Sequence, residues 1–426
     1  MSQLGPLVVV AEQPAPDLVD ALAAAGAFPV VEARWADAPA AFTAIQPAAI
    51  ILAEPGPAAD EAAAQMLGLQ LKTRSGAFIP LIGRSRPNVA AAIPDGLPVD
   101  ADASIDRLVS RLRSALRVRA QHTTVLRRAE TLAAQTGRIA KFPETDPLDD
   151  ATILVAGRGG SYPDLAVAVG ERVGLIGALS IETAAHHLNA RHIDGIIIGD
   201  GFAGKLVDAY LAAIAEDARF RDMPIAVVSP GANLAPLYPV LANLERIDGG
   251  PAQILEWMLP LVRMRAFEAR LKRMLKALDA NGMLDADTGL LSAESFAPEI
   301  ARAVQEAAQH GNGLCIARFA FEAYIDQRTS MDAARLIGAT VRNIDFACRE
   351  ADGGVLLVFT ETDLQAAHLI ARRIAAMLKT TMLIGDRDPR HPATSITLGT
   401  LKATDTAETL LRRVGSRTVA AVPARA

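Results

Sequence analysis

Arg342-Asn343-Ile344-Asp345 places an arginine and a carboxylate three positions apart, shortly before a turn, Ala351-Asp352-Gly353-Gly354, that opens an apolar run. An arginine offers a planar fork of N–H donors, and a carboxylate accepts several hydrogen bonds. Three roles are open for this segment: chemistry on a substrate, ligand binding without a reaction, or a plain β-hairpin. The R-x-x-D spacing alone is a weak signal, because ion pairs between residues three apart are common on solvated helix faces.

The composition is that of a globular protein large enough for several domains. Of the 426 residues, 51% are hydrophobic and 21% charged, and the net charge of −5 gives no electrostatic reason to expect nucleic acid or an anionic membrane as a partner. Two cysteines, Cys315 and Cys348, are too few for a disulfide framework. The start of the chain has no basic leader pattern, and no apolar stretch approaches 18 residues. We therefore expect a cytoplasmic protein without membrane insertion.

The first part of the sequence alternates short apolar runs with helical patterns. Buried strands are expected at 6–11, 48–56 and 78–85. Continuous apolar runs separated by helices are typical of a parallel sheet covered on both faces. A long arginine-rich helical pattern follows at 103–141, and the stretch 142–150, rich in proline and acids, marks a boundary. These patterns predict a first domain over residues 1–145.

The same scheme returns in the second part at matching spacing. The run 151–160 parallels the first strand of the first domain, and 192–201 parallels its strand at 48–56. An internal duplication of an α/β unit is the simplest explanation. The second domain, 149–278, is expected to end in a long linker helix.

The last part, 279–426, has a different pattern. A strand is expected at 313–321 and a β-hairpin at 346–361, with helices before, between and after them. Strands and helices grouped in this way are typical of an α+β, ferredoxin-like sheet.

Several residues of this last part resemble the GGDEF domains of the diguanylate cyclase family. Asp287-Thr288-Gly289-Leu290, followed by Phe296, is similar to the opening of such domains. The segment Ala351–Val355 lies where the G-G-D-E-F turn belongs, and Arg349 precedes it as the family's arginine does. With two receiver-like units ahead of it, the whole chain resembles tandem-receiver GGDEF proteins of the PleD and PopA type. The resemblance implies two CheY-like (flavodoxin-like) receiver domains followed by an α+β, nucleotidyl cyclase-like domain.

The residues that a cyclase of this family needs are not retained. The family holds two metal ions with carboxylates beside a nucleoside triphosphate. No acid occurs in the first-strand segment Cys315–Phe319, and Gly353 and Gly354 replace the acidic pair of the turn, whose two leading glycines are replaced by Ala351 and Asp352. We therefore expect a degenerate GGDEF domain with no enzyme activity, no catalytic residue, no metal and no catalytic cofactor.

The resemblance implies that a binding site for cyclic di-GMP is retained instead. R-x-x-D precedes the turn at the distance at which the family forms its allosteric site for this dinucleotide, which assigns Arg342 and Asp345 to the ligand. Arg373, on the helix after the hairpin, matches a further arginine of that site. An arginine fork can engage a phosphate or the O6 and N7 atoms of guanine, and a carboxylate accepts from guanine N1–H and N2 amino groups. In this context we favour ligand binding over a surface ion pair, and we expect Arg349 to be structural.

The two receiver-like units lack most of the residues of phosphorylated receivers. Such receivers phosphorylate an aspartate at the end of the third strand. Glu54 stands near that position in the first unit, and Asp200 lies one residue beyond it in the second. Ser85 and Ser229 fit the hydroxyl that senses the phosphoryl group, but no lysine follows either of them. We predict pseudo-receivers used for dimerisation and docking, with Glu54 and Asp200 as vestigial phosphoacceptor positions, Asp200 being more simply explained as a loop or capping residue.

The leading hypothesis is a non-catalytic receptor for cyclic di-GMP. It would be a homodimer that recruits or localises protein partners, and the resemblance connects such proteins with regulated proteolysis in the cell cycle and with a polar position in the cell. Two alternatives stay open. One is a weak or partner-dependent diguanylate cyclase, and the other is a signalling scaffold that acts without a nucleotide.

Overall fold

The computed structural model describes most of the chain. The described residues are 4–53, 61–73, 76–84, 96–101, 103–140, 142–228, 241–321, 326–381, 383–384, 389–390 and 393–416. They belong to two compact units, of which one comprises Pro6–Arg119 with Phe142–Leu271, and the other Met1–Gly5, Ala120–Lys141 and Lys272–Ala426. The predicted division at 1–145, 149–278 and 279–426 stays a prediction, since the compact units group both parallel sheets together.

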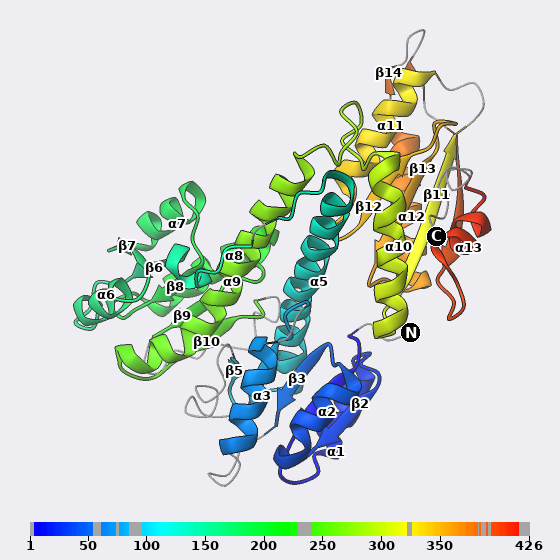
Figure 1. The fold of residues 1–426 in the computed structure, drawn as a ribbon. Coiled ribbons are helices and arrows are strands. Elements are labelled where there is room, and N and C mark those ends of the chain that lie inside the picture. Colours follow the sequence, from blue (N-terminus) through cyan, green and yellow to red (C-terminus); the bar gives the residue numbers. More distant parts are fainter. Residues whose placement is uncertain are drawn as a thin grey trace. The chain divides into compact units, whose positions relative to one another are not determined.

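The first five-stranded sheet is parallel and has the strand order β2-β1-β3-β4-β5 (Figure 1). Strand β1 aligns Val8 with Val31 of β2 on one side and with Ile50 of β3 on the other. Both β1 and β3 are buried along their whole length, which explains their unbroken apolar sequences. The elements are β1 Leu7–Val10, α1 Pro16–Ala24, β2 Val30–Ala33, η1 Trp35–Asp37, α2 Ala38–Ile45, β3 Ala49–Leu52, α3 Glu61–Thr73, β4 Leu81–Arg84, β5 Leu97–Val99 and α5 Ile105–Thr136.

The second five-stranded sheet is also parallel, with the order β10-β9-β8-β6-β7. Its core places Ile153 and Val155 on one face and Leu154 and Ile196 on the other. The elements are η3 Pro147–Asp150, β6 Thr152–Ala156, α6 Tyr162–Gly170, β7 Gly174–Ala178, α7 Ile181–Ala190, β8 Gly195–Ile198, α8 Gly204–Glu216, η4 Ala218–Phe220, β9 Ile225–Val227, β10 Leu244–Arg246 and α9 Pro251–Asp279.

Both sheets share one strand order when each is numbered from its own first strand. That order, 2-1-3-4-5, is the doubly wound order of flavodoxin-like folds. The predicted parallel sheets and their duplicated pattern are therefore confirmed, whereas the function of these units as receivers stays a proposal.

The C-terminal unit contains a four-stranded antiparallel sheet in the order β12-β13-β11-β16. The predicted hairpin is present, because β12 and β13 pair from Phe346–Val358 to Arg349–Val355. Helices α11 and α12 pack on one face of the sheet through a core that includes Phe319 and Ile337. The elements are α10 Ala293–His310, β11 Leu314–Phe321, α11 Gln327–Thr340, β12 Phe346–Arg349, β13 Val355–Thr360, α12 Leu364–Thr380, β14 Leu383–Ile384, β15 Pro389–Arg390, β16 Thr394–Thr400 and α13 Ala407–Arg413.

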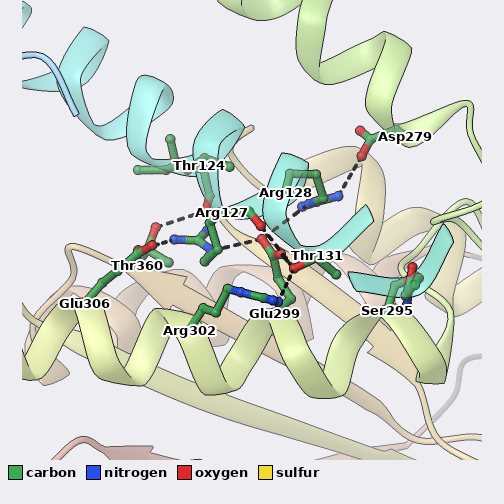
Figure 2. Close-up of polar contacts among 12 residues, drawn as sticks. Thr124, Arg127, Arg128, Thr131, Asp279, Ser295, Glu299, Arg302, Glu306 and Thr360 are labelled. Atoms are coloured by element: carbon green, nitrogen blue, oxygen red, sulfur yellow. Dashed lines mark hydrogen bonds and ion pairs between the residues drawn. The ribbon is translucent and has the colours of Figure 1, made fainter. Parts of the chain in front are cut away.

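The second half of α5 belongs to this C-terminal unit and is attached to α10 by buried charges (Figure 2). Arg127 Nε donates to Glu299 Oε1 at 2.9 Å, and the Glu299 side chain is fully buried. Thr131 Oγ1 donates to the other carboxylate oxygen of Glu299 at 2.9 Å, and Arg128 pairs with both Glu299 and Asp279. A buried carboxylate with its hydrogen-bond partners in place is costly to disrupt, so this network fixes the residues after Ala120 to α10.

No helix in the described part of the chain combines the length and the apolar character needed to cross a membrane.

Candidate functional site

Arg342 lies between the end of α11 and the start of β12, in a corner of the C-terminal unit. Its Nε and Nη2 atoms donate to the two carboxylate oxygens of Asp345 at 2.9 and 3.0 Å. Nη2 also donates to Thr362 Oγ1 at 2.6 Å and to the Thr360 carbonyl oxygen at 3.2 Å. We call Arg342, Asp345, Thr360 and Thr362 the Arg342 corner. The ion pair joins the two residues that the sequence predicted for the ligand, and the two threonines were not predicted.

Asp345 is the buried member of this corner. Its side chain is only 2% exposed, and Oδ1 accepts a further hydrogen bond from the Thr360 backbone N–H at 3.1 Å. Burial raises the pKa of Asp345 above its usual range, although the Arg342 charge and these hydrogen bonds act in the opposite direction. Both carboxylate oxygens therefore have partners within the protein, and Asp345 orients the guanidinium of Arg342.

Arg342 itself reaches the surface, with 49% of its side chain exposed. The four hydrogen bonds of the corner use Nε and Nη2. Within the described residues, Nη1 has no hydrogen-bond partner, so two N–H donors of a fixed guanidinium remain for an external acceptor. Such an acceptor could be a phosphate oxygen or the O6 or N7 atom of a guanine.

Arg373 lies on α12, and its side chain is exposed. Among the described residues it forms no hydrogen bond or ion pair, and nothing joins it directly to Arg342. Its neighbours Ala371 and Ile374 are buried on the face of α12 that packs against the sheet. Arg373 therefore has an exposed guanidinium on a helix that packs against the sheet, and its part in a ligand site stays a prediction.

The turn between β12 and β13 is held closed by an arginine from β11. Arg318 Nε donates to Glu350 Oε2 at 2.6 Å, and Arg318 Nη2 pairs with the Asp352 carboxylate. The side chains of Arg318 and Glu350 are 15% and 3% exposed, and burial tends to lower the pKa of Arg318 while its two carboxylate partners raise it, with a net increase. We call Arg318, Glu350 and Asp352 the Arg318 clamp.

The backbone of the turn is fixed as well. Gly353 has φ of +88°, a conformation that favours glycine, and its carbonyl accepts from Ser330 Oγ at 2.9 Å. Arg349 Nε donates to Ser330 Oγ at 3.1 Å, and the Gly354 N–H donates to Asp352 Oδ1 at 3.0 Å. In the predicted turn Ala351–Val355, the first two residues are exposed and the rest are buried.

These residues do not fit the metal site that the GGDEF resemblance implies. The strand segment expected to supply a carboxylate, Cys315–Phe319, contains Arg318 as its charged residue, and this cation neutralises the nearby acids Glu350 and Asp352. Within the described ranges, no group of three or more histidine, cysteine, aspartate or glutamate side chains could hold a metal ion.

The Arg318 clamp was missed by the sequence reasoning, although one signal was present. Arg318 is a single charge in the otherwise apolar run of β11, and strand pairing places it opposite Leu356, close to the turn. A charged residue in a buried strand requires a partner, and the acids of the neighbouring turn are the closest candidates in the pairing pattern.

The two candidate phosphoacceptor positions differ in what the structure describes. Glu54 lies outside the described residues, as do Ser85 and Ser229. Asp200 is half-buried after β8, where its Oδ1 accepts from Ser161 Oγ at 2.5 Å. A side chain at Gly159 would collide with the Asp200 carboxylate, since its Cβ would lie 2.2 Å from Cγ. Asp200 thus ties the loop after β6 to the loop after β8, which agrees with a loop residue.

No protein-family model and no curated protein matches this sequence. Among solved structures, similarity is found to the GGDEF domain of DgcB from Caulobacter crescentus in complex with c-di-GMP, at 17% identity over 32% of this chain and 88% of that chain, with a TM-score of 0.30. The FimX GGDEF domain from Pseudomonas aeruginosa is similar at 17% identity over 31% of this chain and 89% of that chain, with a TM-score of 0.29. A sensory box/GGDEF family protein from Caulobacter crescentus is similar at 19% identity over 31% of this chain and 93% of that chain, with a TM-score of 0.29. GGDEF domains are therefore among the structural neighbours of this chain.

Proposed function

We propose that this protein is a non-catalytic receptor for cyclic di-GMP that recruits or localises protein partners. The observation that carries the proposal is the state of Arg342. Its guanidinium is fixed by four hydrogen bonds, half of the side chain is exposed, and the Nη1 donors have no partner in the described part of the chain. A guanidinium oriented in advance loses little freedom when it binds a planar or anionic ligand.

The two arginines have different parts in this proposal. Arg342 donates from Nη1 to a guanine edge or a phosphate, and Arg373 supplies a second positive charge from α12. Asp345 orients Arg342, and it can accept from guanine only by exchanging part of its bond with that arginine. Cyclic di-GMP carries two phosphates and two guanines, so an arginine pair with one fixed member suits its charge and its shape.

The absence of catalysis is supported by the Arg318 clamp. The Arg318 guanidinium is paired with Glu350 and Asp352, the acids beside the turn. Gly353 and Gly354 supply no carboxylate there. A cyclase needs metal-bound triphosphate at this place. We therefore expect no cyclic di-GMP from GTP and Mg²⁺, and detectable product would favour the alternative of a weak cyclase.

Isothermal titration calorimetry with cyclic di-GMP tests the proposal on the full chain. We expect binding in the micromolar range for the wild type and at least a tenfold loss for Arg342→Ala, equal to about 1.4 kcal/mol or more. Arg373→Ala should weaken binding less, because that residue adds charge without a fixed geometry. Its neighbour Arg372, also exposed on α12, provides the matched control, and Arg372→Ala should bind as the wild type does.

Two results would decide against the receptor. Absence of binding by the wild type at about 100 µM cyclic di-GMP would leave the scaffold that acts without a nucleotide. Equal affinities for the wild type and Arg342→Ala would show that the ligand, if bound, does not use the Arg342 corner. Circular dichroism of each variant checks that the fold is retained.

A further inference from the structure

The edge strand β7 of the second parallel sheet is exposed in a way that its counterpart in the first sheet is not. β7 lies at the end of the order β10-β9-β8-β6-β7, and no other strand of the described chain pairs with its outer side (Figure 1). Gly174, Leu175 and Gly177 are exposed, and the strand contains no charged residue and no proline. Natural edge strands usually carry such residues, because an open edge can pair with another chain.

The matching edge strand of the first sheet, β2, is protected in the usual way. Pro29 precedes it, and it carries Glu32, whose carboxylate accepts from the Ala15 backbone N–H. A charge on the strand and a proline at its start both oppose the addition of a further strand. The two sheets share their strand order, so the contrast between β2 and β7 is a property of these sequences.

The backbone of β7 has hydrogen-bonding groups directed away from the sheet. Gly174 N donates to Ala151 O at 2.9 Å, and Ala178 O accepts from Gly157 N at 3.0 Å, so both ends of the strand turn their polar groups toward β6. Because these directions alternate along a strand, the N–H and C=O groups of Leu175 and Gly177 face outward. Leu179 follows the strand directly, at the bend that leads into α7.

We propose that β7 pairs antiparallel with β7 of a second copy of this chain, with Gly177 opposite Gly177 on the two-fold axis. In this register Leu175 of one copy lies opposite Leu179 of the other. These side chains are 38% and 62% exposed in the single chain, and Leu175 lies on the same face of the strand as Gly177. The pairing joins the outward backbone groups and covers both leucines, which accounts for an edge that is both apolar and uncharged.

Charges just beyond the two ends of the strand favour the antiparallel direction. Arg172 lies five residues before Gly177, and Glu182 lies five residues after it. Both side chains are exposed, and neither forms a salt bridge within the described residues. Arg172 lies in the turn before β7, and Glu182 lies in the first turn of α7. Antiparallel pairing therefore places the strand end that carries Arg172 of one copy beside the end that carries Glu182 of the other, so that adjoining ends carry opposite charges. A parallel arrangement would not bring these two charges together.

Sedimentation velocity of the full chain over a range of concentrations tests this dimer. A short strand pair is a small interface, so we expect a monomer at about 1 µM and a dimer at about 100 µM. Leu179→Lys should weaken the dimer at least tenfold, because it places two cations beside the pairing edge. Val167→Lys is the matched control, since Val167 is also 62% exposed but lies on α6, and it should leave the dimer unchanged.

Charge exchange tests the antiparallel direction, and cross-linking tests the register. Arg172→Glu should weaken the dimer, and Arg172→Glu combined with Glu182→Arg should restore it. In the variant with Leu175→Cys and Leu179→Cys, the two cysteines of one chain are about 13 Å apart, too far for a disulfide, whereas opposite residues of a hydrogen-bonded pair have Cα atoms about 5.5 Å apart. Oxidation should therefore produce a covalent dimer.

A chain that remains monomeric at about 500 µM overturns the proposal. A dimer that is indifferent to both Leu179→Lys and Arg172→Glu overturns it as well, because the interface would then lie elsewhere. A dimer that Leu179→Lys weakens but the double charge exchange does not restore, and that forms no cross-link, overturns the register.

Discussion

The Arg342 corner and the Arg318 clamp are two arginine sites of one small domain with opposite accessibility. Each contains a guanidinium bonded to a carboxylate that is almost completely buried, Asp345 in one case and Glu350 in the other. The Arg318 side chain is 15% exposed and pairs with two acids, whereas the Arg342 side chain is 49% exposed and pairs with one. The difference teaches how a structural arginine can be distinguished from one that is able to bind a ligand. The deciding features are the number of acids around the guanidinium and the exposure of its outer nitrogens.

The largest expected effect is a loss of folding stability when the structural cation, Arg318, is removed. Arg318→Ala removes the guanidinium that neutralises the buried Glu350 carboxylate, and we expect it to lower the free energy of unfolding by about 3 kcal/mol. Urea denaturation measures this loss. Arg412→Ala is the control, since Arg412 is 66% exposed and lies 4.0 Å from its acid, and it should cost less than about 0.5 kcal/mol. Equal losses for both variants would remove the distinction between a clamp and a surface pair.

The second effect concerns Arg342, the arginine proposed to bind the ligand, and uses the same conservative change at both arginine sites. Arg342→Lys keeps a positive charge beside Asp345 but loses the planar fork, so we expect the affinity for cyclic di-GMP to fall about tenfold. Arg318→Lys should leave this affinity unchanged. Calorimetry compares the two variants, and a similar loss for both would mean that the ligand does not discriminate between the sites.

The third effect is a pH dependence of the Arg342 corner. Burial raises the pKa of Asp345, so this carboxylate takes up a proton at a higher pH than an exposed aspartate, whose pKa is about 3.9. Protonation removes the charge that orients Arg342. We therefore expect the affinity for cyclic di-GMP to decrease about threefold as the pH is lowered toward the pKa of the Asp345 carboxylate. Calorimetry at several pH values measures it.

The raised pKa of Asp345 makes folding stability depend on pH in the opposite direction to ligand affinity. Because the folded state binds the Asp345 proton more readily than the unfolded state, this residue's contribution to stability is largest at low pH and decreases as the pH rises through the window between the two pKa values. Asp345→Asn should remove the part of the pH dependence that this residue contributes, both to the affinity for cyclic di-GMP and to folding stability. Affinity that rises on acidification would contradict the role of Asp345 as the residue that orients Arg342.

The smallest effect is expected at the exposed acid of the clamp. Asp352 is 45% exposed, so Asp352→Asn should lower the free energy of unfolding by about 0.5 kcal/mol and leave ligand binding unaltered. Urea denaturation and calorimetry measure both. A loss as large as that of Arg318→Ala would show that Asp352, rather than Glu350, is the main partner of the clamp.

Much of this structure was accessible from the order of residues. Unbroken runs such as Leu7–Val10 and Gly195–Ile198 predicted buried parallel strands, because only a sheet covered on both faces accepts apolar side chains in both directions. The hairpin around Gly353 was predicted by a glycine-rich turn between two strand patterns. The R-x-x-D spacing offered an ion pair of neighbours as the alternative to the ligand site that was favoured. These are local relations, and local spacing is enough to reveal them.

Contacts between distant segments required the tertiary structure. Arg318 and Glu350 are far apart in the sequence, and only the pairing of β11 with β13 brings them together. Arg127 and Glu299 meet because the second half of α5 packs on α10, which no periodicity of either helix reveals. The sequence by itself determined which residues can carry charge and hydrogen bonds. The tertiary structure decided which charges neutralise one another, and thereby left Arg342 with N–H donors for a ligand.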